Sequence, residues 1–240
     1  MPDEAEAAKQ AAARHAVRSF VRPGMRLALG TGSTAQLAVR ALAEEFPKAT
    51  FDCVASSVRT EELAVSLGIS VRAPVPGDRF DRMLDGADEV TPELALTKGG
   101  GGALLREKLL AHLSREMIVL VDPSKLVRTL GERCPIPVEI VPFARPILER
   151  EFAEAGFEVS HRRYQADRPV QTDNGNEILD LKPLAPIEKP LPVARALRAH
   201  VGVVETGIFL RMAKRVVVGH PDGRVEVRTR GPVQRAPPTA

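Results

Sequence analysis

Hydrophobic positions near the N-terminus repeat with the period of a helix. Residues 3–21 are rich in alanine and poor in β-branched residues, and Ala8, Ala12, Ala16 and Phe20 recur at every fourth position. This spacing puts four apolar side chains on one face. Because alanine is also the strongest helix former, the pattern predicts an amphipathic helix over residues 3–21.

Short apolar runs then alternate with helical segments as far as residue 121. The expected elements are strand Met25–Leu29, helix Thr34–Phe46, strand Phe51–Ala55, helix Arg59–Leu67, short strands Ser70–Ala73 and Arg82–Leu84, helix Ala103–Leu113 and strand Met117–Val121. Strands that alternate with helices predict a parallel sheet covered on both faces. We therefore expect an α/β unit with an open, Rossmann-like parallel sheet.

The chain beyond Gly131 differs in composition, since 13 of the 20 prolines lie there. The pattern predicts strand Val138–Val141, helix Pro146–Ala155, strand Phe157–Tyr164, a strand pair around Asn174-Gly175, helix Pro190–His200 and strand Val203–Leu210. This βαββαβ order is typical of a smaller, ferredoxin-like α+β unit. A last hairpin turns at Asp222-Gly223, and its pattern alone does not assign it to either unit.

Length and composition fit a globular protein. The 240 residues suffice for one large domain or two smaller ones, and 44% of them are hydrophobic and 27% charged. The longest uncharged run, residues 27–39, has 13 residues, whereas a membrane span needs about 18 or more. Since the N-terminus is acidic and lacks an export signal, we expect a cytoplasmic protein without a membrane segment.

The charge distribution argues against nucleic acid as a partner. The net charge is 34 − 31 = +3, and three arginines lie in the acid-free tail 228–240, so the rest of the chain sums to zero. There is no tryptophan and one tyrosine, so a stacking platform for bases is missing. Cys53 and Cys134 have no metal-ligand spacing and are interpreted as small hydrophobic residues.

A glycine-rich string follows the first predicted strand. Gly30-Thr31-Gly32-Ser33-Thr34-Ala35 opens a helix, so it offers backbone N–H groups and hydroxyls to an anion. A phosphate monoester is one candidate. The string also satisfies G-x-G-x-x-A with Asp52 twenty residues beyond Gly32, so a dinucleotide is another, and a purely structural turn is the third.

Two carboxylates follow the strand Arg82–Leu84. In Asp85-Gly86-Ala87-Asp88-Glu89 they lie on a loop at the end of a strand where ligands bind in parallel sheets. They could bind sugar hydroxyls, act as a base or hold Mg²⁺, and a solvated turn is the alternative. No histidine pairs with this loop or with another histidine at ligand spacing, so no metal site is expected.

Four consecutive glycines follow Lys98 and precede the helix that carries Glu107. Such a run is costly in chain entropy, and a linker would not require it, so residues 98–102 suggest a close approach of the backbone to a ligand. N–H groups with a lysine charge suit a developing oxyanion. Glu107 is either part of this site or a surface partner of Arg106 and Lys108.

A fourth polar loop, Asp122-Pro123-Ser124-Lys125, follows the strand Met117–Val121. Lys125 either reaches the same cleft or is solvated. All four loops follow strands and so belong on one edge of the sheet. Together they supply an anion cradle, acids, N–H groups, lysine and one glutamate, a set suited to proton transfer beside a carbonyl group.

These strings closely resemble the type A family of ribose-5-phosphate isomerases in residues, order and spacing. The likeness extends through later segments and covers nearly the whole chain. The segments that carry it are Gly30–Thr34, Asp85–Glu89, Lys98–Gly101 with Arg106-Glu107-Lys108, Asp122–Lys125, Val138–Ala144, Thr172–Asn176 and Gly202–Gly207.

The resemblance implies an isomerase that interconverts D-ribose 5-phosphate and D-ribulose 5-phosphate in the non-oxidative pentose phosphate pathway, through an enediolate and without metal or organic cofactor. It implies that Glu107 shuttles the proton and that Asp85, Asp88 and Lys98 contact the open-chain sugar and stabilise the enediolate. The substrate-binding residues that it implies are Thr31, Gly32, Ser33, Thr34, Asp85, Gly86, Ala87, Asp88, Lys98, Gly99, Gly100, Gly101 and Lys125.

The resemblance also implies homodimers or homotetramers and a smaller unit that covers the cleft as a lid. It places the final hairpin in the first domain, which gives predicted domains of 1–130 with 211–240, and 131–210. The sequence departs from the family pattern at Gly102, where alanine is usual, and in the basic tail. The pKa of Glu107 stays open, because Lys98 and a helix N-terminus would lower it while a dry cleft would raise it.

Two other functions compete with this interpretation. A nicotinamide-dependent oxidoreductase would use Gly30–Ala35, but no catalytic histidine or tyrosine is evident beside it. A non-catalytic sugar-phosphate sensor would need a DNA-binding segment, and no helix-turn-helix precedes the first strand. The combination of Asp85, Asp88, Lys98 and Glu107 argues against sugar-phosphate deamination or coenzyme A transfer on a similar scaffold.

Overall fold

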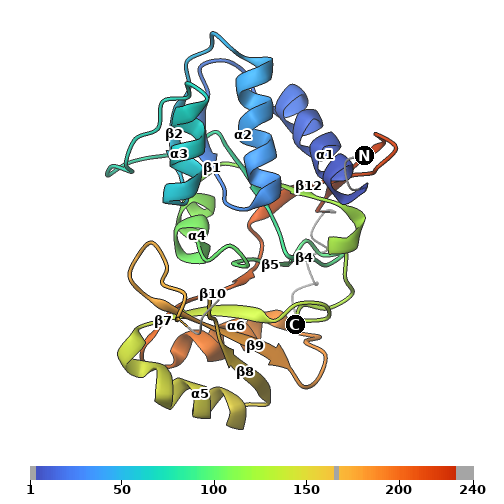
Figure 1. Cartoon of the computed structure of the whole chain (residues 1–240). Coiled ribbons are helices and arrows are strands. Elements are labelled where there is room, and N and C mark those ends of the chain that lie inside the picture. Colours follow the sequence, from blue (N-terminus) through green and yellow to red (C-terminus); the bar gives the residue numbers. More distant parts are fainter. Residues whose placement is uncertain (1–3, 165–167, 231–240) are drawn as a thin grey trace, which may run out of the picture.

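The computed structural model describes residues 4–164 and 168–230. The predicted helix start at Asp3 and the tail from residue 231 lie outside the described residues. A larger α/β half lies above a smaller α+β half, and a short sheet lies between them (Figure 1). No helix in the described part of the chain is both long and apolar enough to cross a membrane.

The larger half is built on a six-stranded sheet in the order β13-β12-β6-β3-β1-β2. Its strands are β1 (Arg26–Leu29), β2 (Asp52–Ala55), β3 (Arg82–Gly86), β6 (Met117–Val121), β12 (Ala213–Gly219) and β13 (Val225–Thr229). All neighbours pair in parallel except β13, which is antiparallel to β12. The predicted hairpin therefore extends this sheet.

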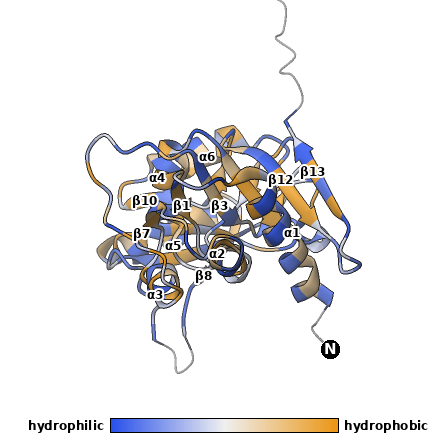
Figure 2. Cartoon of the chain, turned by 90° about the horizontal axis from the view of Figure 1, so that it is seen from above, coloured by the Kyte–Doolittle hydropathy of each residue, from blue (hydrophilic) through white to orange (hydrophobic). Residues whose placement is uncertain are grey.

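Alternate residues of these strands pack against different layers, because successive side chains point to opposite faces. One face packs against helices α1 (Glu4–Phe20), α2 (Ser33–Glu45) and α3 (Val58–Ser66). In the helix α1, the predicted alanines Ala8, Ala12 and Ala16 are buried. In the view of Figure 2 the hairpin that joins β12 to β13 stands beside α1.

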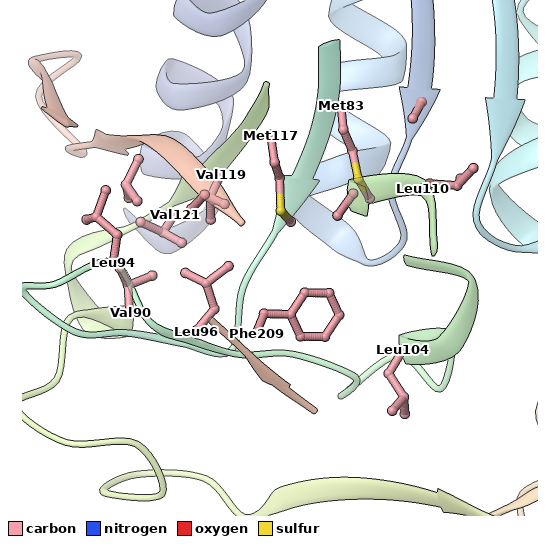
Figure 3. Packing of buried hydrophobic residues seen from close by; sticks show 14 of the residues in the cluster. Met83, Val90, Leu94, Leu96, Leu104, Leu110, Met117, Val119, Val121 and Phe209 are labelled. Atoms are coloured by element: carbon pink, nitrogen blue, oxygen red, sulfur yellow. The ribbon is translucent and has the colours of Figure 1, made fainter. Parts of the chain in front are cut away.

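The second face is covered by helix α4 (Leu104–Leu113) and by a three-stranded sheet that the sequence pattern did not predict. This sheet contains β4 (Glu89–Val90), β5 (Leu96–Thr97) and β11 (Ile208–Phe209). Figure 3 shows Met83 and Met117 pointing from the large sheet toward Phe209. The predicted α/β sheet with helices on both faces is confirmed, and the small sheet shares the second face with α4.

The smaller half has a four-stranded antiparallel sheet in the order β10-β7-β9-β8. Its elements in chain order are β7 (Ile136–Ile140), α5 (Arg145–Glu154), β8 (Phe157–His161), β9 (Glu177–Pro183), α6 (Pro190–Ala199) and β10 (Val203–Thr206). Leu148 and Phe152 of α5 and Leu197 of α6 pack in its core. The predicted βαββαβ order is confirmed. Short 3₁₀ helices follow β6 at Pro123–Lys125 and β7 at Pro142–Ala144.

Three predicted strands differ from the structure. Ser70–Ala73 forms only a single bridge, between Val71 and Cys53. Of the pair expected around Asn174-Gly175, only the strand after it forms; the preceding segment makes a single antiparallel bridge, between Pro169 and Arg163, and Thr172 donates to Glu139. The strand predicted over 203–210 is divided at Gly207, whose N–H donates to Pro137 O (2.6 Å), so that β10 and β11 join different sheets.

Candidate active site

The four polar loops meet at one edge of the large sheet. Three of them begin at the carboxyl ends of β1, β3 and β6, as parallel strands require, and the glycine-rich loop after β5 leads into α4. They enclose a pocket. Its lining residues are Lys9, Thr31, Gly32, Ser33, Thr34, Gly86, Ala87, Asp88, Lys98, Gly99, Gly100, Gly101, Glu107 and Lys125. Every predicted site residue except Asp85 is in this set.

The glycine-rich string after β1 forms an open cradle. Gly32 precedes α2 with φ +106 and without a side-chain cap, so the first N–H groups of the helix have no partner within it. Gly30 is required, because a Cβ there would lie 2.1 Å from Asp85 Cγ. Thr31 Oγ1 donates to Ser57 Oγ (2.8 Å), which holds the turn against the start of α3. An anion would be bound by these free N–H groups.

The position of Asp52 does not fit a dinucleotide site. A ribose-binding acid would stand at the carboxyl end of β2, beside the glycine turn. Asp52 is instead the first residue of β2, at the opposite end of the sheet, and its carboxylate accepts from Arg26 Nε (2.9 Å) and Arg72 Nε (2.6 Å). The glycine string therefore lacks the carboxylate that the dinucleotide fingerprint needs.

A lysine and two carboxylates form a buried cluster at the base of the pocket. Lys98 Nζ lies 2.9 Å from Asp85 Oδ2 and 3.3 Å from Glu107 Oε2, and it donates to Gly86 O (2.8 Å). The side chains of Lys98, Asp85 and Glu107 are 2%, 0% and 3% exposed, respectively. Burial disfavours the ammonium charge, but the neighbouring carboxylates outweigh it and raise the pKa of Lys98. Lys98 is therefore a fixed positive charge.

Asp85 lies behind the pocket rather than in its wall, which differs from the direct sugar contact implied by the resemblance. Asp85 belongs to β3, and its Oδ1 accepts from the N–H groups of Thr31 (3.2 Å) and Gly86 (2.8 Å). Burial raises its pKa, although Lys98 acts in the opposite direction. This carboxylate holds the anion cradle and the lysine in one arrangement.

Glu107 has the environment of a proton acceptor. It lies in the first turn of α4, and its Oε2 faces the Lys98 ammonium at 3.3 Å. Burial raises its pKa to about 8; Asp85 and Asp88 act in the same direction and Lys98 against it. The alternative of a surface charge pair is wrong, since the side chain is buried against Lys98. A carboxylate with a pKa near neutrality is suited to general base chemistry.

The glycine loop approaches Asp88 closely. The N–H of Gly100 donates to Asp88 Oδ2 (2.8 Å), and a Cβ at Gly100 would lie 2.7 Å from Asp88 Oδ1. Gly102 adopts φ +81 and donates its N–H to Gly99 O (3.0 Å). Glycine adopts this left-handed conformation without strain, so the residue that departs from the family pattern suits the loop found here.

Two residues of the site were not found from sequence. Lys9 of α1 reaches the pocket and donates to Ser33 Oγ (3.3 Å). Its neighbours in sequence are helix-face alanines, so nothing local distinguishes it from a solvated lysine. The ring centroid of Phe209 in β11 lies 5.6 Å from Lys98 Nζ and 4.6 Å from Lys108 Nζ. Its position depends on the small sheet, which the pattern did not predict.

Other charged features do not form a comparable site. Within residues 4–164 and 168–230, no group of three His, Cys, Asp or Glu side chains could hold a metal ion. An open hollow of about 420 Å³ lies between α4 and α6. Its buried acid, Glu205, already pairs with Lys108 (2.9 Å) and with Arg198, so no acid there is left to act as a base.

Comparisons with known proteins agree with this geometry. The family model of ribose 5-phosphate isomerase A (phosphoriboisomerase A) matches residues 52–223. Ribose-5-phosphate isomerase A of Thermomicrobium roseum is 44% identical over 220 residues, which cover 91% of this chain and 92% of that protein. The protein of the same name from Cereibacter sphaeroides is 45% identical over 232 residues, covering 93% and 87%.

Solved structures give the same result. Ribose 5-phosphate isomerase A of Methanocaldococcus jannaschii superposes with a TM-score of 0.85 at 37% identity, covering 92% of this chain and 97% of that one. A D-ribose-5-phosphate isomerase in complex with phospho-erythronic acid has a TM-score of 0.90 at 35% identity, covering 95% and 100%. On sequence, fold and pocket together, this chain belongs to the ribose 5-phosphate isomerase A family.

Proposed function

We propose that this chain interconverts D-ribose 5-phosphate and D-ribulose 5-phosphate, with Glu107 as the proton-transferring base. The observation that carries the proposal is the Glu107 carboxylate, which is buried beside the pocket with its Oε2 3.3 Å from Lys98 Nζ. The names of the relatives support the substrate, and the solved relative with phospho-erythronic acid supports a phosphorylated, anionic ligand.

The phosphate group of the sugar would bind at the start of α2. The free N–H groups there, with the hydroxyls of Thr31, Ser33 and Thr34, offer donors to its oxygens, and Lys9 and Lys125 add positive charge to the same pocket. Asp88, Gly86, Ala87 and the glycine loop then face the remainder of the sugar. In this arrangement the reacting carbons would lie beside Glu107.

The reaction would follow from these charges. Glu107 removes the proton from C2 of the open-chain aldose, and the electron pair forms the C1–C2 double bond as the carbonyl oxygen on C1 becomes an oxyanion. Lys98 and the Gly101 N–H of the glycine loop would stabilise this enediolate, since the N–H groups of Gly100 and Gly102 already donate to Asp88 and to Gly99 O. The proton of the C2 hydroxyl then passes to the oxyanion on C1, and the same Glu107 carboxyl group returns its proton to C1 as the C2 oxygen becomes the ketone, so a single base serves both carbon proton transfers.

Asp85 would act through its neighbours rather than on the sugar. Its carboxylate keeps Lys98 charged and holds the Thr31 N–H (3.2 Å). It leaves an excess of negative charge in the cluster, which raises the proton affinity of Glu107. The proposal needs no metal or organic cofactor, since every charge in the scheme comes from the chain.

We further propose two domains, a catalytic one of residues 1–130 with 211–240 and a smaller one of residues 131–210 that acts as a lid over the pocket. We also propose that the chain forms a homodimer or homotetramer in the cytoplasm. Contacts from the four-stranded sheet to the glycine loop support a lid. Phe143 and Val201 lie in the half of the molecule built on the four-stranded sheet, and they are 95% and 94% exposed. These exposed apolar side chains support self-association. Analytical ultracentrifugation of the chain and of a Phe143→Ser variant tests assembly, because a monomer at micromolar concentration would contradict it.

A direct assay tests the activity. Purified protein is mixed with ribose 5-phosphate and an excess of EDTA, and formation of the ketose is measured over time. Turnover that EDTA does not reduce is expected. Absence of ketose would contradict the proposed function, and turnover abolished by EDTA would contradict the metal-free scheme.

A further inference from the structure

Arg162 connects the smaller half of the molecule to the glycine loop of the candidate active site. It follows β8, and its guanidinium binds the Asp180 carboxylate of β9 through Nε (2.8 Å) and Nη2. The remaining nitrogen, Nη1, donates to Gly99 O (2.7 Å) and lies 3.3 Å from Gly100 O. The side chain is 17% exposed. All three nitrogens of the guanidinium are therefore engaged at the junction of the two halves.

These contacts fix the direction of two N–H groups. In a planar trans peptide the C=O and the following N–H point in opposite directions. When Arg162 holds Gly99 O, the N–H of Gly100 points to the other side, where it donates to Asp88 Oδ2 (2.8 Å). The weaker contact with Gly100 O directs the N–H of Gly101 in the same way, toward the pocket that Gly101 lines.

The loop cannot hold this orientation by its own side chains. Its residues have no Cβ, and glycine adopts positive and negative φ about equally well, so rotation of a peptide unit meets little steric resistance. Neighbours lie close along the loop, since a Cβ would lie 2.9 Å from Leu104 Cδ2 at Gly99, 2.7 Å from Asp88 Oδ1 at Gly100 and 3.3 Å from Thr31 Cγ2 at Gly101, but the glycines themselves have no side chain with which to use these contacts. The turn hydrogen bond from Gly102 N–H to Gly99 O and the bond from Gly100 N–H to Asp88 restrain the loop, and Arg162 adds charge-assisted hydrogen bonds to the carbonyl groups of Gly99 and Gly100.

We propose that Arg162, oriented by Asp180, is a positioning residue for isomerisation: it holds Gly99 and Gly100 by their carbonyl groups so that the N–H groups of Gly100 and Gly101 face Asp88 and the developing enediolate. The role requires arginine, because a planar fork binds a carboxylate with two nitrogens and leaves the third for the carbonyl groups. Lysine offers a single point charge. The inference rests on the isomerase activity proposed above.

The test measures kcat and KM for ribose 5-phosphate in Arg162→Ala, Arg162→Lys and Asp180→Asn. We expect kcat to fall at least about tenfold in the first two, with KM changed by less than about threefold, because orientation of N–H donors matters most in the transition state. Asp180→Asn retains the arginine, so its kcat should fall by less than that of the two Arg162 variants. Low millimolar guanidinium should restore part of the rate of Arg162→Ala.

Arg106→Ala is the matched control. Arg106 also crosses between the halves, where it donates to Asp173 O (2.7 Å) and Asn174 Oδ1 (2.9 Å), but it does not touch the glycine loop. Its kcat should change little, and guanidinium should not raise it. Thermal unfolding of every variant shows whether it is folded. If Arg162→Ala does not fold, the kcat values of Arg162→Lys and Asp180→Asn test the inference in its place.

Several outcomes would overturn the inference. It fails if the folded Arg162 variants keep the unaltered kcat, if KM alone changes, or if Arg106→Ala loses as much activity as Arg162→Ala, since the effect would then come from docking of the two halves in general. These results differ from failure of the proposed function, in which the unaltered chain itself forms no ketose.

Discussion

Two clusters of charged residues lie at opposite ends of the same large sheet and have opposite electrostatics. At the amino ends of the strands, Asp52 and Asp78 pair with Arg26 and Arg72. Asp78 accepts from both arginines and from the N–H of Val75 (2.8 Å), and its pKa is lowered, first by hydrogen bonding to Arg72. The charges of two carboxylates and two guanidinium groups balance in this cluster, so the ionised form of the acids is held in place.

At the carboxyl ends, Asp85 and Glu107 share the single ammonium of Lys98. Among the described residues, Asp85 Oδ2 and Glu107 Oε2 have this one ammonium as their shared partner, and burial raises the pKa of both acids. The comparison shows that the number of partners, rather than the presence of charge, separates a structural network from a reactive one. A shortage of hydrogen-bond donors in a buried cluster leaves one carboxylate ready to accept a proton.

The largest expected effect tests the reactive cluster directly. Glu107→Gln keeps the shape but removes the base, so kcat should fall by about 10³ to 10⁴, near the upper range for general base catalysis. Binding of the sugar phosphate should survive, as measured by isothermal titration calorimetry. Retention of most of the activity in the purified variant would contradict the role of Glu107.

The same variant should change stability in a defined direction. Because the folded pKa of Glu107, about 8, lies above its ordinary value of 4.5, the folded state binds more protons between these pH values. Stability of the unaltered chain therefore falls as pH rises through this window. Glu107→Gln should raise Tm more at pH 8 than at pH 5.

Removal of the shared cation should have the next largest effect. Lys98→Met retains the apolar stem but leaves two buried carboxylates without a counter-charge and the enediolate without its nearest positive charge. We expect kcat to fall by about 10² to 10³, comparable with loss of an oxyanion donor. An unchanged kcat in a folded variant would remove Lys98 from the mechanism.

The pH dependence of the unaltered enzyme gives a smaller, graded effect. Since the base must be ionised and burial raises the pKa of Glu107 to about 8, kcat/KM should fall about tenfold per pH unit on the acid side of that value. The measurement is initial rates from about pH 4 to 9 in buffers of constant ionic strength. An acid limb near pH 4.5 would show that Glu107 is ionised like an ordinary glutamate.

The smallest effect on rate is expected at the balanced network. Asp78→Asn leaves Arg26 and Arg72 short of a partner, so Tm at pH 7 should fall by several degrees while kcat stays unchanged. Because the folded pKa of Asp78 is lowered, its stabilisation is present above the ordinary aspartate pKa and is lost as pH falls below it. A large loss of kcat without loss of Tm in Asp78→Asn would contradict the structural role assigned to this cluster.

Most of the architecture could be predicted because it depends on local patterns. Helical spacing in residues 4–20 and alternation of apolar strands with helices are properties of neighbouring residues. The common edge of three of the loops also follows, since parallel strands that alternate with helices place their carboxyl ends together. That rule accounts for the glycine-rich string, Asp88 and Lys125. The loop that carries Lys98 and leads to Glu107 instead follows β5 of the small antiparallel sheet, which the pattern did not predict.

Features that depend on which distant residues pack together could not be predicted in this way. Gly207 divides a predicted strand because it packs against Pro137, 70 positions earlier in the chain. The contacts of Lys9 with Ser33 and of Arg162 with Gly99 cross between elements that no local pattern connects. Even Asp52, at fingerprint spacing from Gly32, stands at the wrong end of its strand for a nucleotide.

The chain's residue order was thus enough to specify the kinds of elements, their sequence and the groups available for chemistry, because these depend on short-range periodicity and on strand direction. Folding in three dimensions decided how deep each group lies and how many partners it has. The pKa of Glu107 is the clearest case. The sequence identified Lys98 and the helix N-terminus as lowering this pKa and a dry cleft as raising it, but the balance depends on the burial of the group and on the neighbouring charges of Lys98, Asp85 and Asp88, which only the tertiary structure decides.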